Sequence, residues 1–488
     1  MGKRTASIII VLILIGTGIW LFAGSGKKEQ TAGKEQVVVK IWDWHIAQQP
    51  VYEKEFEKFM KENPGIKIEH NVISQDQYDN MIQLAFKSGE TPDIFLLPSS
   101  VKAPEAIEKG WVQPLDPYIE NTDWVKRFPA NSFSEGSNKF EGKIYSFPTT
   151  APGLWMIFPL YYNQKLFKAA GLAAPPKTWD ELRDYAKKLT AVGNGKSYGF
   201  IMGGKGDYGW DLNMKVLANA AGTSPHHTMV GFDFRTGQYD FTHPGFAQAY
   251  ELLDNIRKDG SFFPGFMALD DEQARAYFAT DRAAMIVGGV WNIAGWDKYP
   301  NAEYGIAPIP YPGQRKGKFI HGLPGGYQWF FSAKSKNQEA VWKVMDFLSS
   351  VEFSRACVEG GLLLSVFPEA NTDLKNAKML ALSKLADETS VLGPQPYLRN
   401  SNTSLVDRYK SKAAPIKTTF PRAVLNAWTG KVPLTQGLKQ ATKEYNAQFN
   451  EAIALAQKNG LKVSREDFVY SDFNILQDYP VAKLTAKK

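Results

Sequence analysis

The stretch Val37–Leu97 carries the clearest pattern in the chain and reads VVVKIWDWHIAQQPVYEKEFEKFMKENPGIKIEHNVISQDQYDNMIQLAFKSGETPDIFLL. Three of its runs are apolar or alternating, as is typical of strands: 37–44, 66–72 and 93–97. Between them, apolar residues recur at helical spacing: Tyr52, Phe56 and Phe59, then Tyr78, Ile82 and Ala85. This βαβαβ order predicts a parallel sheet joined by right-handed crossovers.

A second α/β region is expected after about Pro152. A capping box at 178–181 marks a helix start there, because the side chains of Thr178 and Glu181 can satisfy free backbone N–H groups. Residues 283–287 read as a buried strand, and 308–317 as a crossover rich in Pro and Gly. An apolar stripe over about 435–458 predicts a long helix near the C-terminus.

Length and composition bound the class of protein. The chain has 488 residues, enough for about two or three domains. Hydrophobic residues make up 44% and charged residues 22%, which excludes a disordered or fibrous chain. The net charge of +7 is small for this length and scattered, so no nucleic-acid partner is expected. Aromatic residues reach 13%, and aromatic faces fill cores or hold flat, partly apolar ligands.

The N-terminus resembles an export signal. Lys3 and Arg4 precede an uncharged run from Ala6 to Ala23, which is a charged region followed by an apolar one. Residues 1–25 are therefore expected to be a cleaved signal peptide or a retained membrane anchor, and both alternatives stay open. Residues 26–36 are polar and Gly-containing, as in a flexible tether. The rest of the chain is predicted to be extracytoplasmic, at the cell surface or in the periplasm, and membrane-tethered or secreted.

Known catalytic and metal-binding motifs are missing from the sequence. The single cysteine, Cys357, forms no intrachain disulfide or multi-cysteine metal site and is expected to be a buried thiol. The adjacent His226 and His227 read as a surface loop rather than a metal site. No cofactor, no metal and no enzymatic activity are predicted. A glycosidase stays open as an alternative, because it needs only two carboxylates that sequence alone cannot pair.

An ordered series of motifs resembles a known family. From Ser88 to Phe95 (SGETPDIF) the chain is similar to the extracellular solute-binding proteins of ABC importers, the sugar-binding group related to maltose-binding protein. The likeness continues in family order over these segments: Trp111–Ile119, Gly142–Pro148, Tyr161–Phe167, Pro175–Leu182, Arg282–Trp291, Tyr304–Pro310 and Gly325–Ser335. It departs from the family at Ser25, where Gram-positive members carry a lipid-accepting cysteine, so lipidation there is impossible.

The resemblance implies a two-lobed α/β fold of the periplasmic-binding-protein type II. Each lobe is expected to hold a mainly parallel sheet, with ligand bound between the lobes and closure by hinge bending. The N-terminal lobe is expected at 37–150 and 312–365, and the C-terminal lobe at 151–311 and 366–488. The expected partners are a carbohydrate and the transmembrane subunits of an ABC importer, with the membrane reached through the N-terminal segment. The protein is expected to be a monomer.

Sugar recognition requires aromatic faces against C–H groups and planar polar groups for hydroxyls. By resemblance, Trp291 and Trp210 are predicted to stack on a sugar ring, with core filling as the alternative for each. Asp207 and Asp211 flank Trp210 and are predicted as polar partners. Trp155, in the segment entering the second lobe, is a further candidate.

The remaining candidates follow strands of the first region, where open α/β sheets place ligand groups. They are Trp44 and His45 after the first strand, Gln75 and Asp76 after the second, and Ser99 and Ser100 after the third. For Asp76, helix capping is the alternative. Gly325 and Gly326 are predicted to allow close backbone approach, with a plain turn as the alternative.

The sequence thus favours a binding protein that delivers a carbohydrate, an oligosaccharide by its size and tryptophan content, to an ABC importer. Two other functions stay open. The same fold could bind a non-sugar solute such as a polyamine, phosphoester or peptide. An exported carbohydrate-active enzyme would instead release products from a glycan.

Overall fold

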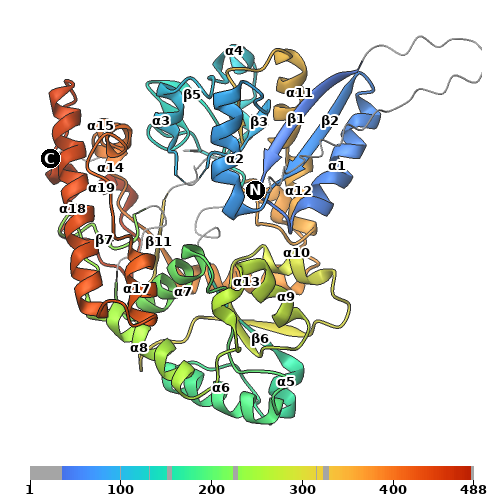
Figure 1. Cartoon of the computed structure of the whole chain (residues 1–488). Coiled ribbons are helices and arrows are strands. Elements are labelled where there is room, and N and C mark those ends of the chain that lie inside the picture. Colours follow the sequence, from blue (N-terminus) through green and yellow to red (C-terminus); the bar gives the residue numbers. More distant parts are fainter. Residues whose placement is uncertain are drawn as a thin grey trace, which may run out of the picture.

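The computed structural model describes residues 36–98, 100–130, 132–150, 157–223, 229–314, 316–322 and 329–484. These residues form two α/β lobes, each around its own sheet (Figure 1). The expected signal or anchor at 1–25 and the tether, except Gln36, lie outside them. Across the described part of the chain, no helix has the length and hydropathy needed to cross a membrane.

The first lobe contains the predicted βαβαβ unit. Its four-stranded sheet has the order β12-β3-β1-β2, and β1 pairs in parallel with both β2 and β3. The register of β1 and β2 runs from Val37↔Ile66 to Asp43↔Val72. The elements of this lobe are β1 (Val37–Asp43), α1 (Gln49–Glu62), β2 (Ile66–Val72), α2 (Gln75–Ser88), β3 (Ile94–Phe95), α3 (Ala103–Glu108), α4 (Asp116–Ile119), β4 (Lys139–Phe140), β5 (Lys143–Ile144), β12 (Phe330–Phe331), α11 (Gln338–Leu348) and α12 (Val351–Glu359).

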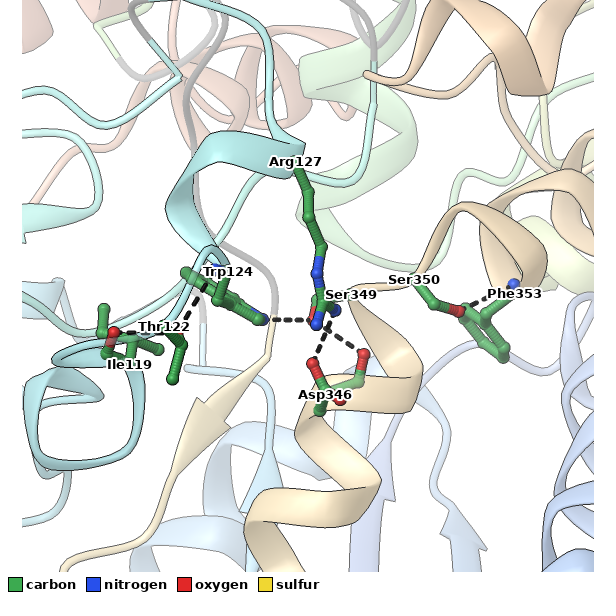
Figure 2. A network of polar contacts seen from close by, with 8 residues as sticks. All are labelled: Ile119, Thr122, Trp124, Arg127, Asp346, Ser349, Ser350 and Phe353. Carbon is green, nitrogen blue, oxygen red and sulfur yellow. Dashed lines mark hydrogen bonds and ion pairs between the residues drawn. The ribbon is translucent and has the colours of Figure 1, made fainter.

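A later part of the chain completes this lobe. Strand β12 adds antiparallel to β3, and helices α11 and α12 pack on β1 and α1. Figure 2 shows the polar contacts that join α11 to the segment before residue 128. Trp124 Nε1 donates to Ser349 Oγ at 2.9 Å, and Arg127 Nη1 donates to Asp346 Oδ1 at 2.7 Å. The first lobe is therefore discontinuous in sequence.

The second lobe holds a three-stranded sheet of order β10-β6-β9. Its elements are β6 (Leu160–Asn163), α5 (Gln164–Ala169), α6 (Trp179–Gly193), α7 (Asp207–Ala220), β7 (Phe232–Asp233), β8 (Gln238–Tyr239), α8 (Pro244–Lys258), α9 (Asp271–Ala279), β9 (Met285–Val287), α10 (Asn292–Asp297), β10 (Tyr304–Ala307), β11 (Phe319–His321), α13 (Ala377–Thr389), β13 (Ser390–Leu392), α14 (Pro396–Arg399), α15 (Asn402–Leu405), α16 (Asp407–Lys410), α17 (Phe420–Trp428), α18 (Leu434–Lys458) and α19 (Val481–Leu484). The capping box at Thr178 and the long C-terminal helix are confirmed.

Two details differ from the sequence prediction. The second sheet was expected to be mainly parallel, but β6 runs antiparallel to both β9 and β10. Residue patterns identify a strand but not its direction, which depends on where the chain enters the sheet. The return to the first lobe was expected at residue 312. Strand β11 instead pairs with β13, and Phe319 lies in the core of the second lobe.

Buried side chains form two clusters, here called the first core and the second core. The first core fills the first lobe and also covers one face of the second sheet, whereas the second core lies on the other face of that sheet. Successive residues of β6 show this division, because Tyr161 belongs to the first core and Leu160 to the second. Apolar packing is therefore continuous where the lobes join.

The segment after Gly460 packs along the second lobe. Its residues Phe468, Tyr470 and Phe473 are buried in the second core. The backbone N–H of Tyr479 donates to the carbonyl of Leu392 in β13, at 2.7 Å. The tail is thus a structural part of the second lobe, a role that the sequence pattern did not reveal.

Candidate functional site

Topology brings several predicted site residues to one edge of the first sheet. Since β1, β2 and β3 are parallel, their carboxyl ends share that edge, and the antiparallel strand β12 begins there. Trp44 and His45 follow β1, Gln75 opens α2 after β2, and Ser100 follows β3. Ser99, Gly325 and Gly326 lie outside the described residues, as does the side chain of Asp76.

Trp44 is half-buried and its orientation is set by a neighbouring ring. The edge of its indole meets Tyr78, with ring centroids 4.8 Å apart. Tyr78 is itself fixed, because its hydroxyl donates to the carbonyls of Trp42 and Leu96 at 3.1 and 2.8 Å. Trp44 therefore combines a rigid backing with a partly exposed ring, which are the two properties that sugar stacking requires.

His45 is only 5% exposed and serves as support for this edge. Its ring packs edge-on against Trp44, Tyr52 and Trp329, with centroids 5.9 to 6.0 Å apart. Burial lowers the pKa of His45, against the opposing effect of Asp43, so the ring is neutral at neutral pH. The aromatic contact with Trp329 links the turn after β1 to the residue that precedes β12.

A buried Asp–His pair holds the same turn, and sequence reasoning missed it. Asp43 is fully buried at the end of β1, where its Oδ1 accepts the backbone N–H of His45 at 2.8 Å. Its Oδ2 lies 2.9 Å from Nε2 of His70 in β2. A buried carboxylate needs such partners to offset the cost of leaving water. The available signal was an Asp at the end of a mainly apolar strand, but its partner His70 is 27 residues away.

The polar candidates of this edge are exposed. Gln75 is the first residue of α2 and faces solvent. Ser100 is also exposed, and its backbone N–H donates to Asp79 Oδ2 at 3.1 Å. The amide of Gln83 donates to the hydroxyl of Ser100 at 3.4 Å. Because both side chains are exposed, each can form a hydrogen bond with a solute without first breaking a buried hydrogen bond within the protein.

Trp291 has the corresponding place in the second lobe. It follows β9, precedes α10 and is half-buried, with its ring 6.1 Å from that of Phe158. It packs against both the first core and the second core. A Cβ on Gly289 would lie 2.3 Å from this indole, so only glycine lets the ring lie against the backbone there. The position of Trp291 is therefore dictated by its neighbours.

Trp210 is a core residue in this structure, which favours the core-filling alternative over its predicted stacking role. Its side chain is 0% exposed, its Nε1 donates to the carbonyl of Gly204 at 3.1 Å, and its ring packs 4.9 Å from Trp428. A ring enclosed in this way offers no face to a solute. The signal was available, because α7 carries apolar residues on every side between 210 and 220, as buried helices do.

The two carboxylates beside Trp210 are engaged in ion pairs. Asp207 Oδ1 lies 2.9 Å from Nη2 of Arg422, and Asp211 Oδ2 lies 2.9 Å from Nζ of Lys215. Their side chains are 38% and 26% exposed, so they remain in contact with solvent. Trp155 lies outside the described residues.

A charged group at the start of α10 was also missed. Arg275 of α9 donates from Nη1 to Oδ1 of the buried Asn292 at 3.2 Å and pairs with Glu272 and Asp271. Burial opposes the charge of Arg275, but Asp271 and Glu272 outweigh it and raise its pKa. The group is neutralised internally and ties α9 to the start of α10.

The described residues contain no group of three or more His, Cys, Asp or Glu side chains able to hold a metal ion. The expected buried thiol is confirmed, since Cys357 is 1% exposed and burial raises its pKa. A thiol in this state is a poor nucleophile.

The fold and these edges define the class of two-lobed α/β binding proteins. Residues 44–353, more than half of the chain, match the family of bacterial extracellular solute-binding proteins, and the chain belongs to that family.

Particular relatives include a maltotriose-binding protein of Pyrococcus abyssi, 27% identical over 335 residues, which cover 66% of this chain and 64% of the relative. The sn-glycerol-3-phosphate-binding periplasmic protein of Salmonella typhimurium is 31% identical over 197 residues, or 40% of this chain and 43% of the relative. Among solved structures, an ABC transporter solute-binding protein from Thermotoga lettingae bound to α-D-tagatose superposes with a TM-score of 0.65 at 22% identity, covering 85% of this chain and 100% of the other. These likenesses confirm the predicted family and the type II two-lobed fold.

Proposed function

We propose that this protein is the extracytoplasmic solute-binding component of an ABC importer and that its solute is a carbohydrate, an oligosaccharide rather than a single ring. It captures the sugar between its lobes by hinge bending and delivers it to the transmembrane subunits. The observation that carries the proposal is the pair of half-buried indoles, Trp44 after β1 and Trp291 after β9, one at a strand end of each lobe.

The aromatic rings that pack against the two indoles favour a sugar as the solute. Trp44 is backed by Tyr78 and Trp291 by Phe158, so each ring keeps one orientation without cost on binding. Gln75 and Ser100 supply exposed groups for hydroxyls, and Asp76, Ser99, Trp155, Gly325 and Gly326 are proposed to complete the site. Asp207 and Asp211 are proposed as outer contacts through their solvent-exposed surface.

The hinge gives the transport role its physical basis. A solute that touches both lobes stabilises the closed form by its differential contacts, so the membrane subunits can tell loaded from empty protein. We propose that residues 1–25 are a cleaved signal peptide or a retained membrane anchor and that residues 26–36 are a flexible tether, so that the protein is either secreted or held at the membrane. It acts as a monomer and performs no chemistry on the solute.

A phosphorylated solute is the second candidate, because of the 31% identity to a glycerol-3-phosphate-binding protein. Binding a phosphate calls for cations free to pair with it. Lys215 and Arg275, two cations of the second lobe, are already neutralised by Asp211 and by Asp271 with Glu272. We therefore rank this candidate below a neutral sugar.

The test is a melting-temperature screen of the purified full chain against maltotriose, raffinose, chitotriose, xylotriose, tagatose and sn-glycerol-3-phosphate. We expect at least one saccharide to raise the melting temperature, and W44A and W291A to abolish that rise. W342A is the matched control, because Trp342 is also a half-buried indole of the first lobe and stacks on Tyr118 at 5.2 Å.

A response to sn-glycerol-3-phosphate alone would favour the second candidate. No response to any saccharide would contradict the proposal, as would release of shorter products from the bound glycan.

A further inference from the structure

The two lobes also contact each other through a helical segment of the second lobe. Residues 396–412, here called the bridge segment, contain α14, α15 and α16. Helix α16 packs against α18 of the second lobe and also against α3 of the first. Figure 1 shows α14 and α15 beside α18, on the side of the molecule where α3 lies.

The bridge segment is anchored firmly in the second lobe. Val406 is 1% exposed and belongs to the second core. The guanidinium of Arg399 lies over the ring of Tyr470 at 3.6 Å and donates from Nη1 to the carbonyl of Val469 at 2.9 Å. Asn400 donates from Nδ2 to the carbonyl of Lys462 at 2.8 Å. The segment therefore moves with the second lobe.

Two ion pairs reach from this segment to the first lobe. Arg408 Nη1 lies 2.9 Å from Oε1 of Glu141, and Lys412 pairs with Glu108 at the end of α3. Both cations belong to the second lobe and both carboxylates to the first, so the attraction acts across the boundary. The carboxylates are 63% and 45% exposed, which leaves both pairs open to screening by salt.

Close packing accompanies the charges. Gly136 of the first lobe has φ +83°, and a Cβ there would lie 2.3 Å from Cβ of Ser404 and 3.0 Å from Cβ of Tyr397. The side chains of Tyr397 and Ser134 share a hydrogen bond, and burial raises the pKa of Tyr397. Backbone and side chains of the two lobes are thus in direct contact around the ion pairs.

We propose that the bridge segment is an ionic latch that opposes separation of the lobes. A hinge motion that moves Glu108 and Glu141 away from Lys412 and Arg408 must break both ion pairs and the contact at Gly136. The inference rests on the proposed hinge motion but not on the identity of the solute. Exposed ion pairs each shift an equilibrium by about 1.4- to 5-fold, so the two together favour the latched form by about 2- to 30-fold.

The experiment measures the distance between the lobes of the full chain without any solute. Spin labels are placed at L84C in α2 and V192C in α6, whose native side chains are 64% and 45% exposed. Cys357 is 1% exposed, so labelling is confined to the introduced positions. Double electron–electron resonance then gives the fraction of molecules with separated lobes at low and high NaCl.

The reversal E108K/E141K is expected to increase the ratio of separated to latched molecules by at least the 2- to 30-fold that the two pairs supply. Adding R408E/K412E swaps the charges and is expected to restore the latched fraction. In the unaltered protein, 0.5 M NaCl is expected to shift the distances in the same direction as the reversal.

The matched control is E352K/D472K, which changes the net charge equally. It breaks two exposed pairs that lie within single lobes, Lys58–Glu352 and Lys483–Asp472. Equal distance distributions for control and reversal would overturn the inference, as would a charge swap that fails to restore the latched form. The distance measurement uses no solute, so it tests the latch independently of the sugar proposal. A negative sugar screen would not contradict the latch, and absence of the latch would not contradict sugar binding.

Discussion

Replacing Trp210 by phenylalanine separates a core role from a solute-binding role. Trp210 is 0% exposed, and its indole N–H is the donor to the carbonyl of the buried Gly204. Phenylalanine keeps most of the ring but leaves that carbonyl without this partner, which costs about 1–3 kcal/mol of unfolding free energy. The larger truncation W210A also leaves a cavity among Phe266 and Trp428, for a total loss of about 3–5 kcal/mol.

The assay is denaturant unfolding followed by circular dichroism, combined with the saccharide melting shift on the same proteins. We expect W210F to unfold at lower denaturant concentration while keeping the full saccharide response. W291A is expected to show the opposite pattern, because its ring is only half-buried: a loss of about 1 kcal/mol, with the saccharide response abolished.

The result that would refute this reasoning is a W210F protein of unchanged stability that no longer responds to saccharide. It would mean that the Trp210 ring reaches the solute despite its burial here.

Three further predictions concern individual residues. G289A is expected to lower saccharide affinity at least tenfold, because the added Cβ would displace the Trp291 indole. Titration calorimetry measures this affinity, and an unchanged value would contradict the placement of the ring. T178A is expected to lower the free energy of unfolding by about 1 kcal/mol, because it removes the hydroxyl that accepts the backbone N–H of Glu181. Denaturant unfolding measures this loss, and an unchanged stability would contradict the prediction. Burial lowers the pKa of His45, so its contribution to stability is complete above the ordinary value of about 6.5 and declines as the pH falls below it. Unfolding of H45N at pH 7.5 and 5.0 should therefore show a weaker loss on acidification than the unaltered protein, and an equal loss would refute the assignment.

Much of the fold could be predicted because its helices and strands depend on interactions between residues that are close together in the sequence. The strands of the first lobe, the capping box at Thr178 and the helix Leu434–Lys458 follow from spacing and from contacts between residues at most four apart. The edge that carries Trp44, Gln75 and Ser100 followed as well, because parallel strands place their carboxyl ends together.

What the sequence determined by itself was therefore the local elements, the family motifs and the shared strand edge at which we propose that a solute binds. Only the tertiary structure decided that Trp210 is enclosed while Trp291 is half-buried, that Asp43 is paired with His70, and that residues 396–412 touch both lobes. The reason is physical: backbone conformation is governed by sterics between adjacent residues, whereas the burial and pairing of a side chain depend on segments that are distant along the chain and meet only after folding.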